Sequence, residues 1–281
     1  MIIIKKTAHL TALLSGLAIP RNRVGFVPTM GALHAGHLSL LAASKQANPF
    51  TVASIFVNPA QFNDKKDFEK YPVTIEKDIE LLVAAGCDAV FLPSVEEMYP
   101  QGWQQPQPYQ LGYLETLLEG KFRPGHFQGV CLVMHRLMDL VQPGNLYMGQ
   151  KDYQQCMVVS RLLSIIQSSA LLHTCPTLRE PDGLAMSSRN TRLTKDERSD
   201  ATAIYRTLMF IKNTLAPGDT AMLVKNSESM LAKHHFRVEY VALADAQTLE
   251  PVTHWDGVQQ LVALIAAFQN EVRLIDNMLL Y

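Results

Sequence analysis

The chain has 281 residues, of which 48% are hydrophobic and 18% are charged, and its formal net charge is -1. This balance excludes a disordered or fibrous chain and is typical of a globular protein with a sizeable core, built as one large domain or two unequal ones. A near-neutral charge without a dense basic run argues against nucleic-acid binding, because a protein that grips phosphate backbones needs a basic excess. We therefore expect small molecules, or other copies of the chain, as partners.

The four cysteines lie far apart in the sequence and form no CxxC pair, which predicts reduced thiols in a cytoplasmic protein rather than a zinc site or a disulfide scaffold. The apolar run at residues 2–4 is followed directly by two lysines, so it predicts a short strand and not a signal peptide. No stretch approaches the roughly 18 apolar residues that a membrane span requires. We expect a cytoplasmic protein with no membrane partner.

Over the first 175 or so residues, short apolar runs alternate with stretches of helical periodicity. The predicted strands cover residues 2–4, 24–27, 51–57, 88–92, 146–148 and 171–175. The predicted helices cover residues 38–47, 75–85, 129–141 and 153–166. Such alternation implies parallel strands joined by helical crossovers, that is, a doubly wound α/β sheet. Sheets of this kind bind ligands beyond the carboxyl ends of their strands.

The pattern changes after residue 175. A polar stretch containing Pro and Gly, residues 176–192, is longer than an ordinary loop and is either a functional loop or a linker between domains. Helical sequence follows at residues 196–215 and 220–233, and strand-like sequence at residues 236–243, 260–267 and 271–275. We therefore expect two domains, residues 1–176 and a smaller α+β unit at residues 177–281.

Two histidines and two glycines follow the second predicted strand, within residues 28–37. Gly31 and Gly36 allow the backbone to approach a ligand closely, and a helix is expected to start near Gly36 or His37. His34 and His37 are three residues apart and therefore share a face of a helical turn. The N–H groups of a helix start favour anions, and each imidazole can donate a hydrogen bond to a phosphate oxygen. Surface or capping histidines are the alternative, and the lack of a Gly-Lys-Ser/Thr ending excludes a Walker A loop.

Amide side chains follow the third predicted strand. Asn58 and Gln61 can both donate and accept hydrogen bonds, as a ligand with hydroxyls and a carboxylate requires, although Asn58-Pro59 can also simply form a turn. Farther along the chain, Arg123 and His126 precede a predicted helix and either contact a phosphate or shape the loop.

Two further polar segments follow the fifth and sixth predicted strands. Lys151 is a cation near a predicted helix start, Asp152 can either cap that helix or contact Mg²⁺, and Gln155 is expected to project from the first turn toward the ligand. Residues 182–190 bring two hydroxyls and a guanidinium to a segment that contains glycine. This composition suits a loop that closes on a triphosphate, or a polar linker between domains.

These five segments, in this order and spacing, resemble the pantothenate synthetase (pantoate–β-alanine ligase) family, and the resemblance runs through nearly the whole chain. It includes Tyr71-Pro72, the stretch from Pro93 to Pro100, and the closing sequence Arg273-Leu274-Ile275-Asp276-Asn277. It implies a Rossmann-like N-terminal domain of the adenylate-forming nucleotidyltransferase superfamily, a smaller domain that closes over the site, and a homodimer. Residues 34–37 are similar to the HIGH motif of that superfamily, and residues 186–189 to its KMSKS loop.

The resemblance also implies the roles of individual residues. The ATP site would consist of Met30, Gly31, Ala32, Leu33, His34, Ala35, Gly36, His37, Gly149, Gln150, Lys151, Asp152, Leu178, Met186, Ser187, Ser188 and Arg189. Pantoate would be held by Gln61 and Gln155, with Asn58 and Tyr71 in the same pocket, and Gln61 would also lie near β-alanine. The catalytic residues would be His34, His37, Lys151 and Arg189, with His37 as the proton donor. ATP would act with Mg²⁺, for which Asp152 is the candidate ligand.

The chain departs from the family pattern at three positions. Val73 stands where the family usually has Arg, which puts in doubt any role of charge there. Gln150 replaces a Glu and so removes one negative charge beside Lys151. Arg136 stands where the family often has Lys, which keeps the charge.

The expected reaction has two steps: the pantoate carboxylate attacks the α-phosphate of Mg·ATP, and the amine of β-alanine then attacks the activated carbonyl. A cytidylyltransferase is one rival, but it has no need of an acid pocket at Gln61 and Gln155. An aminoacyl-tRNA synthetase would need tRNA-binding modules and a basic surface. A non-catalytic nucleotide-binding scaffold would have no need of the His, Lys, Ser and Arg set.

Overall fold

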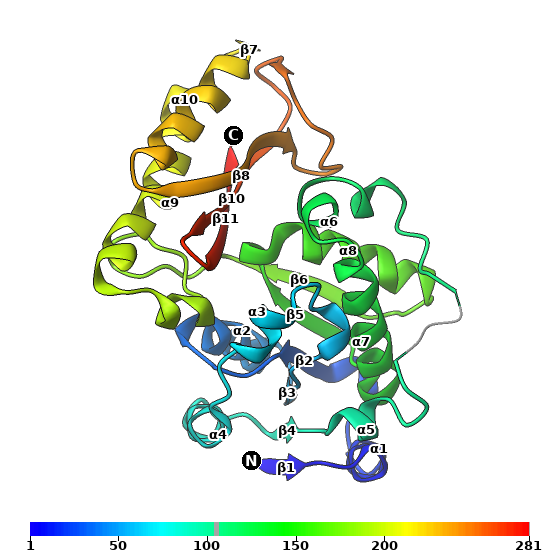
Figure 1. The fold of residues 1–281 in the computed structure, drawn as a ribbon. Helices are drawn as coiled ribbons and strands as arrows, with labels where there is room; N and C mark the ends of the chain where they lie inside the picture. Colours follow the sequence, from blue (N-terminus) through cyan, green and yellow to red (C-terminus); the bar gives the residue numbers. More distant parts are fainter. Residues whose placement is uncertain (104–106, 281) are drawn as a thin grey trace. The chain divides into compact units, whose positions relative to one another are not determined.

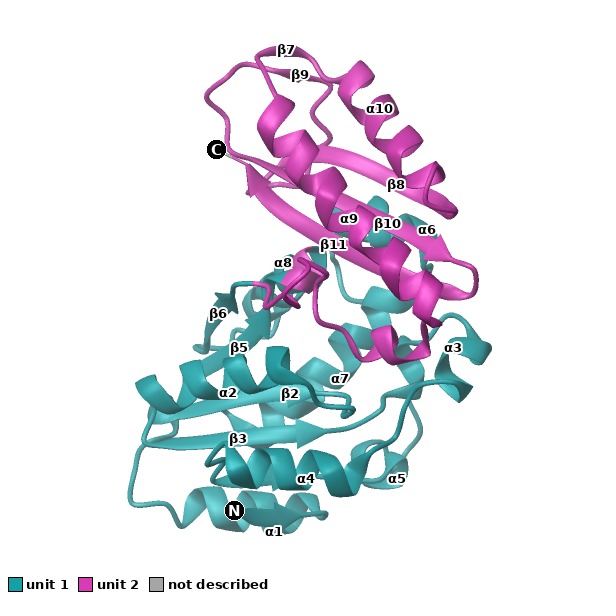
Figure 2. Ribbon diagram, turned by 90° about the vertical axis from the view of Figure 1, so that its left-hand side faces the viewer, with its two compact units in different colours: residues 1–150, 154–176 teal, residues 151–153, 177–281 magenta. Residues whose placement is uncertain are grey.

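The computed structural model describes residues 1–103 and 107–280. The chain divides into two compact units, one made of residues 1–150 and 154–176, and the other of residues 151–153 and 177–281 (Figure 2). Each unit has its own core, and each is described by itself below.

The first unit is built on a six-stranded sheet in which all strands are parallel. Its strands are β1 (Ile2–Ile4), β2 (Val24–Thr29), β3 (Phe50–Ile55), β4 (Ala89–Phe91), β5 (Asn145–Gly149) and β6 (Leu171–Cys175), and their order is β1-β4-β3-β2-β5-β6. The residues of β2 and β3 are almost all buried, as expected for strands covered on both faces. The predicted doubly wound α/β fold is confirmed, and each predicted strand is present with ends shifted by up to two residues.

Helices cover both faces of this sheet (Figure 1). On one face lie α2 (Ala35–Ala47) and α4 (Ile75–Ala84), whose Leu40, Leu41 and Leu82 pack in one core cluster with Val27 and Ile55. On the other face lie α1 (Thr7–Ser15), α7 (His126–Val141) and α8 (Tyr153–Ile165). The chain moves outward from β2 to β3 and β4 and then returns to place β5 on the other side of β2. This reversal is the topological switch point, the place where such sheets bind ligands.

Several elements of the first unit were not predicted. They are α1 and the short helices α3 (Lys65–Glu69), α5 (Val95–Met98) and α6 (Leu118–Phe122), and the 3-10 helices η1 (Arg21–Arg23), η2 (Pro59–Gln61), η3 (Gly112–Glu115) and η4 (Gln150–Asp152). The helix α7 begins three residues before the predicted start, at His126, because Gly125 adopts a positive φ of 79° that turns the chain into it.

Helix α1 lacks a capping side chain of its own and is capped by Glu97 from α5. The Glu97 carboxylate accepts hydrogen bonds from the Thr7 N–H at 2.8 Å and the Thr7 hydroxyl at 2.8 Å, and it pairs with Lys6 at 3.0 Å. The Thr7 N–H first, and Lys6 next, lower the pKa of Glu97 to about 2. Because the pKa is lower in the folded state, the stabilising effect is complete above the ordinary value of about 4.3 and is lost as the pH falls toward 2.

We therefore expect Glu97→Gln to lower the melting temperature at pH 7, and this deficit to shrink as the pH falls from about 4 toward about 2. Melting curves of both proteins across that range test this. A deficit that stays the same down to pH 2 would show that the ionised carboxylate is not what stabilises the fold.

The second unit packs two helices, α9 (Lys195–Thr214) and α10 (Ala221–Ala232), on a three-stranded antiparallel sheet. That sheet has the order β11-β10-β8 and consists of β8 (Phe236–Asp245), β10 (Leu261–Gln269) and β11 (Val272–Leu280). Its core includes Ile204, Leu208 and Leu231 from the helices and Ile265 from the sheet. A small ribbon joins β7 (Gly218–Asp219) to β9 (His254–Trp255). The predicted smaller α+β unit is confirmed, with β11 extending five residues beyond its predicted end.

The connector after β6 is not a single long loop. Residues 178–186 form a tight hairpin, in which Arg179 and Ala185 make an antiparallel bridge and the Met186 N–H donates to the Leu178 carbonyl at 3.0 Å. Gly183 turns this hairpin with a φ of 92°. The 3-10 helix η5 (Ser188–Arg192) follows, with Ser187 as its N-cap.

Candidate active site

The loop between β2 and α2 is shaped by its two histidines. His34 is the N-cap of α2, so the helix starts at Ala35, one or two residues before the start expected near Gly36 or His37. The His34 Nδ1 accepts from the Gly36 N–H at 3.1 Å, and the His37 Nδ1 accepts from the His34 N–H at 3.4 Å. The two rings lie 4.1 Å apart. A neutral imidazole whose Nδ1 accepts carries its proton on Nε2, so each ring caps the helix with one nitrogen and can donate with the other.

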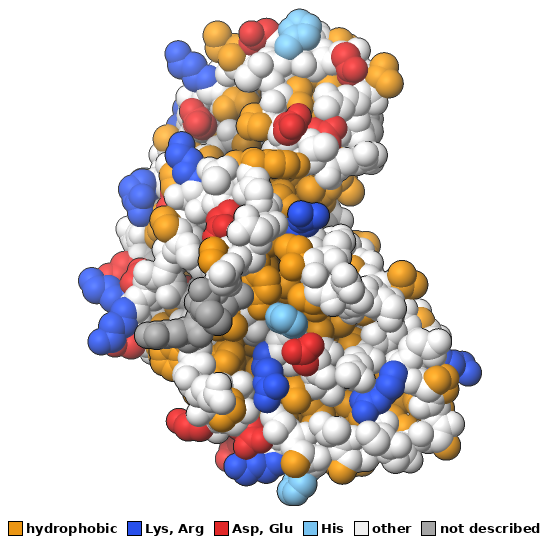
Figure 3. All heavy atoms as spheres, turned by 90° about the vertical axis from the view of Figure 1, so that its right-hand side faces the viewer, with side chains coloured by type: hydrophobic (Ala, Val, Ile, Leu, Met, Phe, Trp, Pro, Cys, Tyr) orange, Lys and Arg blue, Asp and Glu red, His pale blue; other side chains and the backbone are white. Residues whose placement is uncertain are grey.

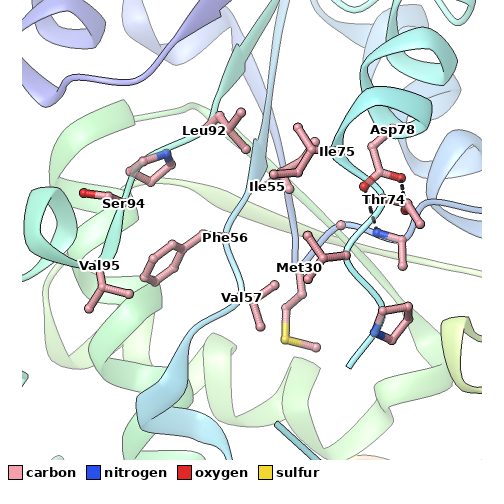
Figure 4. A pocket seen from close by; sticks show the side chains of 15 residues that line it. Met30, Ile55, Phe56, Val57, Thr74, Ile75, Asp78, Leu92, Ser94 and Val95 are labelled. Atoms are coloured by element: carbon pink, nitrogen blue, oxygen red, sulfur yellow. Dashed lines mark hydrogen bonds between the residues drawn. The ribbon is translucent and has the colours of Figure 1, made fainter. Parts of the chain in front are cut away.

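The backbone of the same loop is hydrogen-bonded to a buried carboxylate that the sequence analysis did not identify. Asp78, on α4 and labelled in Figure 4, is 1% exposed. Its two oxygens accept from the Ala32 N–H at 2.9 Å and the Leu33 N–H at 2.8 Å. Thr74 donates to the same carboxylate at 3.1 Å. Ala32 has a φ of 49°, a strained value for a residue with a side chain, which these bonds help to maintain. Asp78 thus fixes the backbone that leads into His34.

A cavity of about 190 Å³ opens where β2, β3 and β4 end. Figure 4 shows its lining, which is mostly apolar and includes Met30, Phe56 and Val57, with Asp78 and Ser94 among the polar side chains. Val73, at the position where an arginine was expected from the family pattern, also lines it and is 67% exposed. The cavity wall therefore carries no cation at that position.

The loop after β3 places Gln61 beside the β2 loop. The Gln61 Nε2 lies 2.8 Å from the Met30 Sδ, and its Oε1 accepts from the Asn58 Nδ2 at 3.2 Å. Asn58 is 1% exposed; its Nδ2 also donates to the Gly129 carbonyl, and its Oδ1 accepts from Tyr99 at 2.9 Å. Two of the predicted acid-pocket residues are therefore in contact, with Asn58 supporting Gln61 from the buried side.

Helix α7 packs against the loop that follows β3. A Cβ at Gly129 would lie 2.0 Å from the Ala60 carbonyl oxygen, so only glycine allows this close approach. The His126 Nδ1 lies 2.7 Å from the Gln61 carbonyl oxygen, and its Nε2 lies 3.0 Å from the Arg123 Nη1. The carbonyl can only accept and the guanidinium can only donate, so His126 is the tautomer protonated on Nδ1. Of the two alternatives for Arg123 and His126, these contacts favour the shaping of the loop.

Tyr71 and Gln155 complete the predicted acid pocket. Tyr71 is buried, and its ring packs edge-on against Phe62, 5.8 Å away. Gln155 lies in the first turn of α8 and is half-buried. Its neighbour Gln154 is buried, donates to the Leu114 and Leu117 carbonyls at 2.7 and 3.0 Å, and accepts from a backbone N–H. The side chain of Gln154 therefore joins the start of α8 to η3 and the segment that follows it. Gln155 is less buried than Gln154.

Gly149 ends β5, the strand next to β2, and Gln150 follows it; both belong to the first unit. Lys151 and Asp152 belong to the second unit, and the Lys151 Nζ lies 3.5 Å from the Asp152 carboxylate. The second unit also holds Leu178, which is exposed, and the remaining predicted ATP residues, which are Met186, Ser187, Ser188 and Arg189. The Ser187 hydroxyl accepts from the Arg189 N–H at 3.3 Å and starts η5.

Across residues 1–103 and 107–280, no three His, Cys, Asp or Glu side chains are grouped as a metal site. Among the same residues, none of the helices has the length and apolar character that crossing a bilayer requires.

All four cysteines are thiols, and burial raises the pKa of Cys87 to about 11 and that of Cys131 to about 12. Basic and acidic side chains are interspersed on the face drawn in Figure 3.

The geometry of the first unit defines a class of protein. A helix start that carries two imidazoles follows β2, an ordered loop follows β5 across the switch point, and a loop with the paired amides of Asn58 and Gln61 follows β3. A doubly wound sheet with such loops at its switch point is the arrangement of a nucleotide-binding enzyme.

Comparison with known proteins gives the family. The profile of the pantoate–β-alanine ligase family matches residues 2–279, so the chain belongs to that family. A pantothenate synthetase of Bacteroides fragilis is 44% identical over 280 residues, which cover 99% of this chain and 98% of the relative. The structure is also similar to that of pantothenate synthetase from Thermus thermophilus, with a TM-score of 0.90, 43% identity and 99% of each chain covered.

A second similar structure contains bound ligands. It is the pantoate–β-alanine ligase of Francisella tularensis complexed with β,γ-ATP and β-alanine, at a TM-score of 0.83 and 35% identity, covering 99% of this chain and 97% of that one. Family membership makes the chain an ATP-dependent ligase that joins pantoate to β-alanine.

Proposed function

We propose that this ligation takes place at the ends of β2, β3 and β5, in two steps through a pantoyl-adenylate. The observation that carries the proposal is the contact between the Gln61 Nε2 and the Met30 Sδ at 2.8 Å. It joins the amides after β3 to the loop that carries His34 and His37, so an acid bound by Gln61 would lie beside phosphates bound at that loop.

In the first step, a carboxylate oxygen of pantoate attacks the α-phosphorus of ATP. The bond from that phosphorus to the bridging oxygen of the β-phosphate breaks, and pyrophosphate leaves. The enzyme contributes mainly position and charge stabilisation, because the carboxylate is already a nucleophile and needs no deprotonation. We assign the Nε2–H groups of His34 and His37, together with Lys151 and Arg189, to the charge that develops on the phosphates. The proton-donor role of His37 is then that of a hydrogen-bond donor to the departing pyrophosphate, without net proton transfer.

In the second step, the neutral amine of β-alanine attacks the carbonyl carbon of the mixed anhydride. The bond from that carbon to the phosphate oxygen breaks, AMP leaves, and the amine nitrogen loses a proton as the amide forms. Activation is essential, because a free carboxylate does not react usefully with an amine at neutral pH. We assign Gln61 to both acids and Gln155 to pantoate, with Asn58 and Tyr71 supporting the pocket.

The rest of the ATP site follows from the same proposal. Residues 30–37 and 149–152 would line the nucleotide, Leu178 would contact it, and residues 186–189 would hold the triphosphate. Mg²⁺ bound to ATP is held largely by phosphate oxygens and by one or two protein carboxylates, a role that suits the half-exposed carboxylate of Asp152. Bound there, the ion would offset negative charge on the phosphates. We also propose that residues 177–281 act as a lid over the site and that the protein is cytoplasmic. We further propose that it is a homodimer, which a measurement of its mass in solution tests.

Pyrophosphate release from Mg·ATP tests the reaction. We expect release when pantoate alone is added, and pantothenate together with AMP only after β-alanine is added. If pyrophosphate release did not depend on pantoate, the acid pocket would be misassigned, and other carboxylates and nucleotides such as CTP would be tried in its place. If ATP bound but no pyrophosphate formed with any acid, a non-catalytic nucleotide-binding protein would be the better description.

A further inference from the structure

The closing sequence on β11 has no part in the site described so far. Asp276 and Asn277 are polar, yet they are only 3% and 2% exposed. Buried polar groups are normally retained with hydrogen-bond partners, and the identity of those partners indicates what the groups hold in place. Asn277 binds a segment that the proposed function assigns to the phosphates, and Asp276 binds the hairpin that leads to another such segment.

Asn277 holds the segment that contains Lys151. Its Nδ2 donates to the Lys151 carbonyl oxygen at 2.9 Å. A second bond fixes the same segment, because the Tyr153 hydroxyl donates to the Ala246 carbonyl at 2.6 Å. Residues 151–153 thereby belong to the second unit, although the chain on either side of them belongs to the first. The Lys151 side chain is itself mostly buried, with 17% of its surface exposed.

Asp276 holds the hairpin that leads to residues 186–189. Its carboxylate makes a bidentate ion pair with Arg179, at 2.6 and 3.1 Å. Arg179 in turn donates to the Gly183 carbonyl at 3.0 Å and to the Asn277 carbonyl at 3.3 Å, and it stacks over the Tyr205 ring at 4.7 Å. The guanidinium fork and the buried carboxylate leave this hairpin little freedom relative to β11.

Two adjacent residues of one strand therefore fix both segments from which the second unit supplies cations to ATP. We propose that Asn277 is a positioning residue for Lys151, and that Asn277 and Asp276 together keep Lys151 in register with the segment 186–189. This inference rests on the proposed function, since it assigns Lys151 and Arg189 to the phosphates. Its consequence is that the two cations meet the triphosphate as one preformed set instead of being ordered separately.

The test is a comparison of the two half-reactions in Asn277→Ala. Loss of the Lys151 anchor should raise the KM for ATP or slow pyrophosphate release by about 10-fold to 100-fold, as expected when a catalytic group is misplaced by about 1 Å. The KM for pantoate should change little. The reaction of isolated pantoyl-adenylate with β-alanine should also be nearly unchanged, because no triphosphate takes part in it.

A double-mutant cycle shows whether the effect passes through Lys151. In a Lys151→Ala background, Asn277→Ala should have almost no further effect on pyrophosphate release, because the side chain that it positions is already absent. Additive effects, or equal slowing of both half-reactions, would overturn the proposal. If the wild-type protein showed no pantoate-dependent pyrophosphate release, the proposed function would fail first, independently of Asn277.

Two variants control for stability. Ser227→Ala removes another buried hydrogen bond from a side chain to a backbone carbonyl in the second unit, 2.8 Å to Leu223 on α10, and should leave the KM for ATP unchanged. Tyr153→Phe removes only the second anchor of the Lys151 segment and should raise the KM for ATP a few-fold without unfolding the protein. If Ser227→Ala changed the KM for ATP as much as Asn277→Ala, or if Tyr153→Phe changed nothing, the anchoring role would be wrong.

Discussion

His37→Ala should slow pantoate-dependent pyrophosphate release by about 10²–10³-fold, the usual effect of removing one hydrogen-bond donor that stabilises developing charge. Nucleotide binding in the ground state should weaken much less, because the donor matters most where charge develops in the transition state. Single-turnover measurement of pyrophosphate release at saturating ATP and pantoate gives this rate directly. An unchanged rate would remove His37 from the catalytic set.

The capping geometry supplies the control that this experiment needs. His37 also accepts from the His34 N–H through its Nδ1, so alanine removes a helix-capping contact as well as a donor. Glutamine at this position of a helix can restore such a contact. His37→Gln should therefore unfold at nearly the wild-type temperature and yet remain slow. Recovery of activity in His37→Gln would mean that the shape of the loop, and not the imidazole donor, limits the rate.

Asp78→Ala should be the most destabilising single change near the site. It leaves the buried N–H of Leu33 and the part-buried N–H of Ala32 without their acceptor, at a cost of about 1–3 kcal/mol for the buried group and less for the other. Pyrophosphate release should fall by about 10²-fold in the molecules that remain folded, because His34 follows these residues directly. Urea unfolding and single-turnover rates at a temperature where the variant is folded measure the two effects.

Thr74→Ala is the matched control for Asp78. It removes one hydroxyl donor from the same carboxylate but leaves both backbone N–H bonds in place. Its cost should be about 1 kcal/mol, with little change in the rate of pyrophosphate release. If Thr74→Ala slowed the reaction as much as Asp78→Ala, the hydrogen bonds from Asp78 to the loop backbone would not explain the slow rate. The charge and solvation of the carboxylate would then explain it.

The residues that sequence reasoning found and those it missed differ in a physical way. The sheet followed from apolar runs and helical periodicity, because burial imposes those patterns on the local sequence. His34, His37 and Gln61 could be proposed as site residues because they follow strands and carry polar groups that a core does not need. Asp78 carried no such signal, since an acidic residue in the first turn of α4 is also what the helix dipole favours.

Contacts between distant parts of the chain explain the other misses. Helix α1 depends on Glu97, ninety residues away, for its cap, and a single sequence does not display that pairing. The hairpin at residues 178–186 is stabilised by Arg179 and Asp276, which are 97 residues apart. Its sequence alone, rich in polar residues with one glycine, looks like a loop. The family resemblance included the closing sequence, but it did not predict that Asp276 pairs with Arg179 or that Asn277 binds the Lys151 carbonyl.

The assignment of residues 151–153 to the second unit has a practical consequence for dissecting the protein. The polypeptide passes from one unit to the other at residues 150/151, 153/154 and 176/177. A fragment that begins at residue 177 would lack a piece of its own structure, with Asn277 deprived of the Lys151 carbonyl and Ala246 of the Tyr153 hydroxyl. A fragment that ends at residue 176 would carry those three residues without the Asn277 and Ala246 groups that bind them. Cutting the chain at the apparent domain boundary would thus damage both halves, whereas a circular permutant that keeps residues 151–153 in covalent continuity with both units would preserve every one of these bonds.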